Sequence, residues 1–208
     1  MMTVAPQSPR LVARYGAPRV VSAGMGCVAL GLTLLGLFAR VDSSYVRILP
    51  MFLVLPLGMA LTISPMTASI MSAVPLGRAG AGSAMNDTTR ELGGALGVAV
   101  LGSVLASRFA SQMGGAVTGL SADAARVARG GLAGGLSAAR EVGGEAGVKL
   151  ADAARASFVS GLHVAALVAA VAAVAASLTV GRLLPRTAQV PQPERVVVPD
   201  LALEPAAE

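Results

Sequence analysis

The chain alternates between long runs without charged side chains and short polar stretches. Four runs are free of Asp, Glu, Lys and Arg, and they cover 20–39, 48–77, 92–107 and 156–181. A helix that crosses the hydrocarbon core of a bilayer needs about 20 mostly apolar residues. Three of the runs are about that long or longer, and each of these is bounded by arginines on both sides. The pattern predicts an all-α, polytopic integral membrane protein with four transmembrane helices.

The polar stretches between the runs give the predicted organisation. We expect a cytoplasmic N-terminal segment (1–19), a transmembrane helix (20–39), an outer turn (40–47) and a second transmembrane helix (48–76). A cytoplasmic loop running into the third transmembrane helix (77–109), an outer loop (110–156), a fourth transmembrane helix (157–184) and a disordered cytoplasmic tail (185–208) follow. Inside the outer loop, a short helix capped by Ser121 and a helical lead-in at 149–157 are expected.

The stretch SAMNDTTRELGGALGVAVLG, residues 83–102, joins a polar half to an apolar half. Its helix can start at a capping box formed by Thr88 and Glu91, or near Ala79. We favour the earlier start, because a span that begins at Leu92 would barely cross about 30 Å of hydrocarbon. On the longer helix Asn86 and Arg90 lie one turn apart on the same face.

Small residues recur at helical spacing in the same stretch. Gly93 and Gly97 form a small-xxx-small pair, and Gly102 follows on the same helix. Helices in lipid associate through close backbone contact, so these glycines are predicted helix-packing positions. The alternative is that such a pattern is general to any span rich in Gly and Ala.

Composition supports the membrane class and narrows the chemistry. Only 13% of the residues are charged, against about 25% in soluble domains. Aromatic residues make up 3% of the chain and do not alternate with basic residues, so nucleic acid is not an expected partner. The single cysteine, Cys27, can form no internal disulfide, and two ligands are missing for a cysteine-based zinc motif. We expect no metal and no cofactor.

Titratable side chains are scarce inside the four runs. None contains Asp or Glu, and the one titratable group within them is His163. A role for His163 in a proton pathway competes with a packing role, and one histidine without a partner carboxylate makes no relay. Asn86, Arg90 and His163 are the candidate substrate or cavity residues, with helix packing or a positive-inside anchor as the alternative for Arg90. No Ser/His/Asp set or phosphate-binding glycine loop is present, so an enzyme is not expected.

Three segments carry a family resemblance. Residues 9–19, PRLVARYGAPR, resemble the basic "R-x-G-x-R" cytoplasmic loop of major facilitator superfamily transporters. Residues 75–86, PLGRAGAGSAMN, followed by 89–102, TRELGGALGVAVLG, resemble the penultimate-helix region of the fourteen-helix drug/proton antiporter branch. Residues 157–163, SFVSGLH, resemble the entry to its final helix. The resemblance covers the C-terminal four-helix portion of such a transporter, a partial major facilitator fold.

The resemblance implies efflux of small hydrophobic or cationic compounds across the inner (cell) membrane of a bacterium, with cytoplasmic termini. It also implies a departure, because the N-terminal half, where the family carries its membrane-embedded acidic residues, has no counterpart here. We therefore expect a truncated or split multidrug efflux chain that is not active alone. Its expected partners are the lipid bilayer, a complementary N-terminal transporter half and a small lipophilic substrate. The alternative is a small non-transporting membrane protein that packs against or regulates a partner membrane protein.

Overall fold

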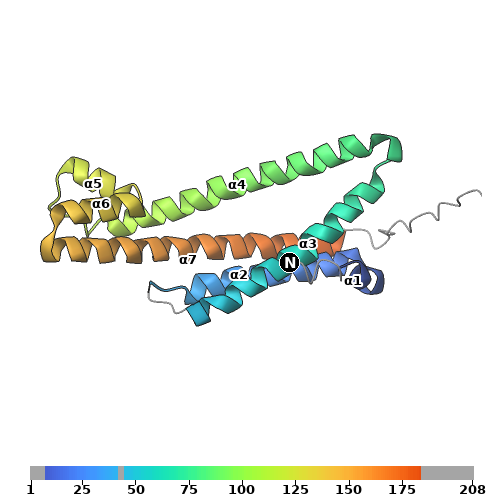
Figure 1. Cartoon of the computed structure of the whole chain (residues 1–208), viewed down its shortest axis with the longest axis horizontal. Coiled ribbons are helices and arrows are strands. Elements are labelled where there is room, and N and C mark those ends of the chain that lie inside the picture. The colour runs from blue at the N-terminus through green and yellow to red at the C-terminus, as the bar shows by residue number, and fades with distance from the viewer. Residues whose placement is uncertain (1–7, 42–44, 184–208) are drawn as a thin grey trace, which may run out of the picture.

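The computed structural model describes residues 8–41 and 45–183, and within them the chain is built from helices (Figure 1). In chain order these are α1 Ser8–Tyr15, α2 Ala17–Phe38, α3 Tyr45–Ala73, the one-turn 3-10 helix η2 Leu76–Arg78, α4 Ala79–Met113, α5 Ala122–Arg129, α6 Leu132–Val142 and α7 Gly144–Leu183. Four of them are long and apolar enough to cross a membrane, namely α2, α3 from Leu49 onward, α4 and α7. This confirms the prediction of an all-α polytopic membrane protein with four transmembrane helices.

Helices α1, α2 and α3 form one end of the molecule. Gly16 joins α1 to α2 with a φ of 83°, a left-handed conformation that glycine adopts without strain. The sharp turn brings Val12 of α1 beside Ala17 and Val20 of α2, and Leu61 of α3 packs on the same small cluster. The basic segment before α2 is therefore folded back against the helix pair.

Helix α2 packs closely against α3 through glycine. A Cβ added to Gly58 of α3 would lie 2.6 Å from the carbonyl oxygen of Gly24 on α2. One added to Gly31 of α2 would lie 2.8 Å from Leu55. Real Cβ atoms do not approach that closely, so the two backbones meet at a distance that only glycine permits. Three prolines lie inside α3, which continues as a helix through all of them: Pro50, Pro56 and Pro65.

Helix α7 runs antiparallel to α2, and polar contacts join the two helices at two positions along their length. Near one end, the Ser22 and Ser177 hydroxyl oxygens lie 2.9 Å apart, and each hydroxyl donates to the other residue's backbone carbonyl. Near the other end, the ring of His163 contacts the carbonyl of Ala39. At 1.5 Å per residue, the two levels are about 21–25 Å apart, within the roughly 30 Å of a hydrocarbon core.

Helix α4 starts at Ala79, so the longer of the two predicted helices is the one that forms. It meets α7 near its far end, where Gly161 lies against Leu105, and it diverges from α7 toward Ala79 (Figure 1). Most of its middle is exposed. Cβ atoms added to Gly93, Gly97 and Gly102 would meet no atom of the described residues within 4 Å. Their role in helix packing therefore stays a prediction.

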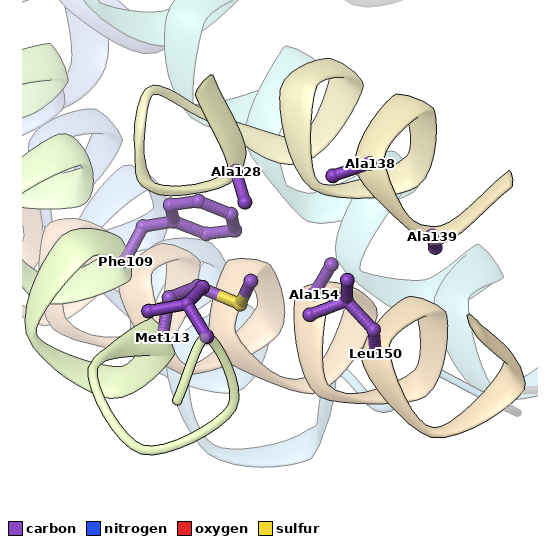
Figure 2. Packing of buried hydrophobic residues seen from close by; sticks show 8 residues of the cluster. Phe109, Met113, Ala128, Ala138, Ala139, Leu150 and Ala154 are labelled. Carbon is purple, nitrogen blue, oxygen red and sulfur yellow. The ribbon is translucent and has the colours of Figure 1, made fainter. Parts of the chain in front are cut away.

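The end of the molecule opposite α1 carries a small folded cap, which we define as α5, α6 and the adjoining ends of α4 and α7. Figure 2 shows its core, in which Phe109 and Met113 of α4 lie among side chains of α5, α6 and α7. The buried members are Phe109, Met113, Val117, Ala128, Ala138, Ala139, Leu150 and Ala154. Gly135 and Gly147 allow close contact with Ala154 and with the Ala139 carbonyl. The predicted Ser121 cap forms, because its side chain accepts from the Ala124 amide.

The predicted outer loop is more helical than the sequence indicated. Helix α6 was not expected, and α7 begins at Gly144, where the prediction had a lead-in from 149 and a transmembrane helix from 157. Charged side chains occur along the first part of α7, so no apolar run marks it. That part stays helical because Leu150 and Ala154 pack into the cap. The predicted tail at 185–208, residues 1–7 of the N-terminal segment and residues 42–44 of the outer turn lie outside the described residues.

Candidate functional site

A cavity of about 570 Å³ lies between α3 and α4, at the end of the molecule that carries α1. Its volume is within the roughly 300–1,000 Å³ that is usual for small-molecule sites. One wall is a stripe of α3 and the residues after it, Thr62, Ile63, Met66, Thr67, Ile70, Val74 and Pro75. The other is a stripe that begins at the N-cap of α4, Arg78, Ala81, Gly82, Met85, Asn86, Thr89 and Arg90.

Both walls follow the helical period. On α4 the lining positions recur every three or four residues, which is the spacing of one helix face. The two walls meet where Gly82 is buried against Val74, at 2.7 Å from an added Cβ. A larger side chain at position 82 would separate the helices, so this glycine sets the narrow end of the cavity.

The polar groups of the cavity are cations, hydroxyls and one amide. The hydroxyls of Thr62 and Thr89 donate to carbonyls of their own helices, at 2.8 Å in each case. They can therefore offer a ligand only an acceptor. Asn86 is half-buried and can both donate and accept, whereas Arg78 and Arg90 are exposed and only donate. The lining includes no Asp or Glu, so the site is positively charged.

Two of the three candidate residues meet in this cavity. Asn86 and Arg90 line it together, one turn apart on α4. His163 does not belong to it, since this residue lies on α7, where its Nε2 is 2.5 Å from the carbonyl oxygen of Ala39. Ala39 is the C-cap of α2. A contact with that carbonyl requires the proton on Nε2, and it satisfies one of the carbonyls that a helix end leaves unpaired.

The α3 wall was missed in the sequence. Thr62, Met66 and Ile70 lie in an apolar run that predicts a span but not its neighbour. The five hydroxyl side chains of this run, Thr62, Ser64, Thr67, Ser69 and Ser72, do not distinguish the two threonines that line the cavity, so the run carries no clear signal of this wall. Within the described residues, no group of three or more His, Cys, Asp or Glu side chains is placed to hold a metal ion. The arrangement suits binding of an amphipathic ligand.

Comparison with known proteins places the chain in a family. It is 30% identical over 168 residues to the multidrug efflux pump LfrA of Mycolicibacterium smegmatis, covering 81% of this chain and 33% of that protein. It is 37% identical over 110 residues to the multidrug resistance protein Stp of Mycobacterium tuberculosis, covering 53% of this chain and 20% of that protein. No protein-family profile matches the chain.

The chain thus spans at most about a third of the length of these relatives. The match to LfrA covers 81% of the chain. A relative that is an efflux pump agrees with the four helices that are long and apolar enough to cross a membrane. The resemblance seen in the sequence is confirmed by these relatives. The chain belongs to the major facilitator superfamily, is similar to multidrug efflux pumps of that family and corresponds to part of such a protein.

Proposed function

We propose that the chain is the C-terminal four-helix segment of a drug/proton antiporter that exports small hydrophobic or cationic compounds. The observation that carries the proposal is the 30% identity to LfrA along 81% of the chain. The exposure of the middle of α4 supports the proposal. In lipid, small residues favour close helix contact, so a stripe of glycines with no neighbour suits a helix that other helices of a longer protein would cover.

We propose that the assembled protein transports its substrate and that these four helices alone do not. Alternating access rocks one bundle of helices against another around a central site. Helices α2, α3, α4 and α7 form one group, in which α4 diverges from the others toward Ala79 (Figure 1). A complementary N-terminal half would supply the opposing group, together with the membrane-embedded carboxylates that the four charge-free runs lack. We propose no enzymatic activity.

We propose that Asn86 and Arg90 belong to the α3–α4 cavity and that His163 is a packing residue. The positive charge of the cavity disfavours a cationic compound, which argues against drug binding there. His163 fastens α7 to the end of α2, and a histidine held by a backbone carbonyl has no carboxylate with which to relay a proton.

Chimeric pumps test the function. The 168 matching residues of LfrA are replaced by those of this chain, and efflux of a lipophilic cationic dye is measured in cells. We expect proton-dependent efflux from the chimera and none from residues 1–208 alone. A chimera that accumulates in the membrane as well as LfrA but exports no dye would favour the regulatory alternative. Efflux by residues 1–208 alone would show that a small oligomer transports unaided.

We propose the inner membrane as the location, with the α1 end facing the cytoplasm. Basic residues close to a span decide orientation. At the α1 end Arg19 and Arg78 immediately flank spans. At the other end Arg40 and Arg155 also flank spans, whereas Arg126, Arg129 and Lys149 lie further from the bilayer, because α7 extends about 28 Å beyond His163 to its start at Gly144. The family resemblance favours cytoplasmic termini as well.

Cysteine labelling tests the orientation. In a Cys27→Ser background, single cysteines are placed at Ser121 and Ser137 on the cap and at Ser83 in the first turns of α4. A membrane-impermeant thiol reagent applied to intact cells is expected to label the two cap positions and not position 83. Labelling of position 83 alone would reverse the orientation.

A further inference from the structure

The cavity between α3 and α4 holds two arginines without an acidic partner among the described residues. Arg78 and Arg90 make no ion pair there, whereas ion pairs of 2.7–2.8 Å occur elsewhere at Arg126–Asp123, Lys149–Glu145 and Arg155–Asp152. Asp87 and Glu91 are neighbours of the lining residues along α4, but neither is part of the lining. Most of the remaining lining is apolar, so a matching occupant combines negative charge with apolar side chains.

Helix α7 ends level with this cavity. Leu105 of α4 lies against Gly161 of α7, and this contact serves as a common reference for the two helices. At 1.5 Å per residue, Arg90 lies about 22 Å from the contact and Arg78 about 40 Å from it along α4. Leu183, the last residue of α7, lies about 33 Å from the contact along α7. The chain therefore leaves α7 at a height between the two arginines, at the end of the molecule that carries α1 (Figure 1).

The end of α7 is also close to the cavity across the helices. A Cβ added to Gly181 of α7 would lie 3.4 Å from the Ser22 hydroxyl oxygen of α2. One added to Gly24 of α2 would lie 2.6 Å from the hydroxyl oxygen of Thr62, which lines the cavity on α3. The axes of packed helices are about 8–10 Å apart, so about 16–20 Å separates α7 from α3. Residues 184–195 can span about 40 Å when extended, which is more than this distance.

The segment that follows has the composition that the cavity requires. Residues 196–204, VVVPDLALE, contain valines, leucines and two acidic residues and no Lys or Arg. Asp200 and Glu204 are about 13 Å apart in an extended chain. Arg78 and Arg90 are about 18 Å apart along α4, and the length of their side chains covers the difference.

The other segments outside the described residues do not match the cavity in this way. Residues 1–7 contain no acidic residue. Residues 42–44 connect the ends of α2 and α3 that are remote from the cavity. The C-terminal segment is thus favoured both by charge and by its starting point.

We propose that residues 196–204 of the chain's own C-terminal tail dock in this cavity, with Asp200 and Glu204 paired to Arg78 and Arg90 and the apolar side chains against the α3 wall. Guanidinium groups bind carboxylates through paired hydrogen bonds. The cavity also includes the first turn of α4, where the positive end of the helix dipole favours negative charge. The proposal does not depend on transport, since it rests on residues of this chain alone.

Disulfide formation tests the docking. In a Cys27→Ser background, Ala202→Cys in the tail is combined with Ala81→Cys, a lining position on α4. The matched control combines Ala202→Cys with Ser83→Cys, which is exposed at nearly the same height but lies on the opposite face of α4, outside the lining. The purified chain of 208 residues is oxidised in dilute detergent solution, and mass spectrometry follows the disulfide within one chain. Reaction of each single cysteine with a small disulfide reagent corrects for its own reactivity.

We expect the disulfide to form about tenfold faster from position 81 than from position 83, because docking raises the local concentration of the tail thiol at the cavity. Thr89→Cys, at a second lining position, should also react faster than the control. Arg78→Gln with Arg90→Gln should reduce the rate at position 81 to that of the control, and so should Asp200→Asn with Glu204→Gln. Arg126→Gln with Arg129→Gln on α5, an equal loss of charge, should leave the rate unchanged. Circular dichroism of every variant confirms that it is folded.

Three results would overturn the proposal. Equal rates at positions 81, 83 and 89 would leave the cavity to a partner other than this tail. A fast reaction that persists in a folded chain lacking both arginines would remove the assigned ion pairs. Disulfides formed between two chains, with a yield that falls on dilution, would assign the cavity to the tail of a second copy.

Discussion

Helices α2 and α4 both carry glycines at helical spacing, but they differ in what lies against those glycines. On α2, Gly24 and Gly31 face α3 at distances that exclude a side chain, and Gly36 lies against Leu167 of α7. On α4, Gly93 and Gly97 face no described atom within 4 Å. The same sequence signal therefore leads to close packing in one helix and to open surface in the other. A stripe of small residues shows where a second helix can approach closely, but it does not show which helix does so.

The difference has a simple explanation if the chain is part of a longer transporter. Close helix contact in lipid gains from small residues only where a second helix is present. The relative LfrA has about three times the length that this chain matches, so a protein of that length has further chain with which α4 could be covered. Helix α2, by contrast, finds α3 and α7 within the same 208 residues.

The largest expected effect distinguishes the packed end of α4, in the cap, from its exposed middle. Phe109 is 1% exposed in the cap, so Phe109→Ala should lower the free energy of unfolding by about 3–5 kcal/mol. Val98→Ala, at a side chain that is 75% exposed, should change it little. Denaturation of the purified chain in detergent measures both. Equal effects at the two positions would mean that the cap is not a packed core.

A second comparison makes the same substitution, glycine to leucine, at a closely packed glycine and at an exposed one. Gly58→Leu puts a Cβ 2.6 Å from the backbone of Gly24, and overpacking of this kind costs about 1–3 kcal/mol. Gly97→Leu meets open space and should leave the isolated chain as stable as the wild type. Thermal unfolding in detergent gives the ranking. If Gly58→Leu unfolds at the wild-type temperature, the close α2–α3 contact is contradicted.

The smallest expected effect concerns the polar contact between α2 and α7. Ser177→Ala removes hydrogen bonds to Ser22, and bonds between membrane helices average about 0.6 kcal/mol. Thr179→Ala is the matched control, since the Thr179 hydroxyl bonds within its own helix to Ala175. The free energy of unfolding should fall for Ser177→Ala more than for Thr179→Ala. The reverse order would remove the serine pair as a link between the helices.

The sequence was sufficient for the spans because charge-free length is a local property. It also favoured the start of α4 at Ala79, since nothing between Gly82 and Leu92 opposes a helix. It was not sufficient for α6 or for the start of α7. There, an outer loop was predicted at 110–156, whereas Gly135 of α6 lies against Ala154 in the cap. Close contacts with a distant segment cannot be seen from glycine spacing alone.

The cavity was predictable only on one side. Asn86 and Arg90 could be placed on one face of α4 by spacing, and both line it. Their neighbours Met66 and Ile70 on α3 depend on how two helices pair. That pairing is set by Gly82 against Val74, a tertiary contact without a sequence signature.

We propose that the exposed glycine face of α4 is covered by other helices in the complete transporter. The most direct measurement compares Gly97→Leu in residues 1–208 alone and in the LfrA chimera that contains them, by thermal unfolding of each purified protein. We expect no change in the isolated chain. In the chimera we expect a lower unfolding temperature, because overpacking costs about 1–3 kcal/mol. An unchanged unfolding temperature in both proteins would show that the face lies against lipid and would contradict the claim.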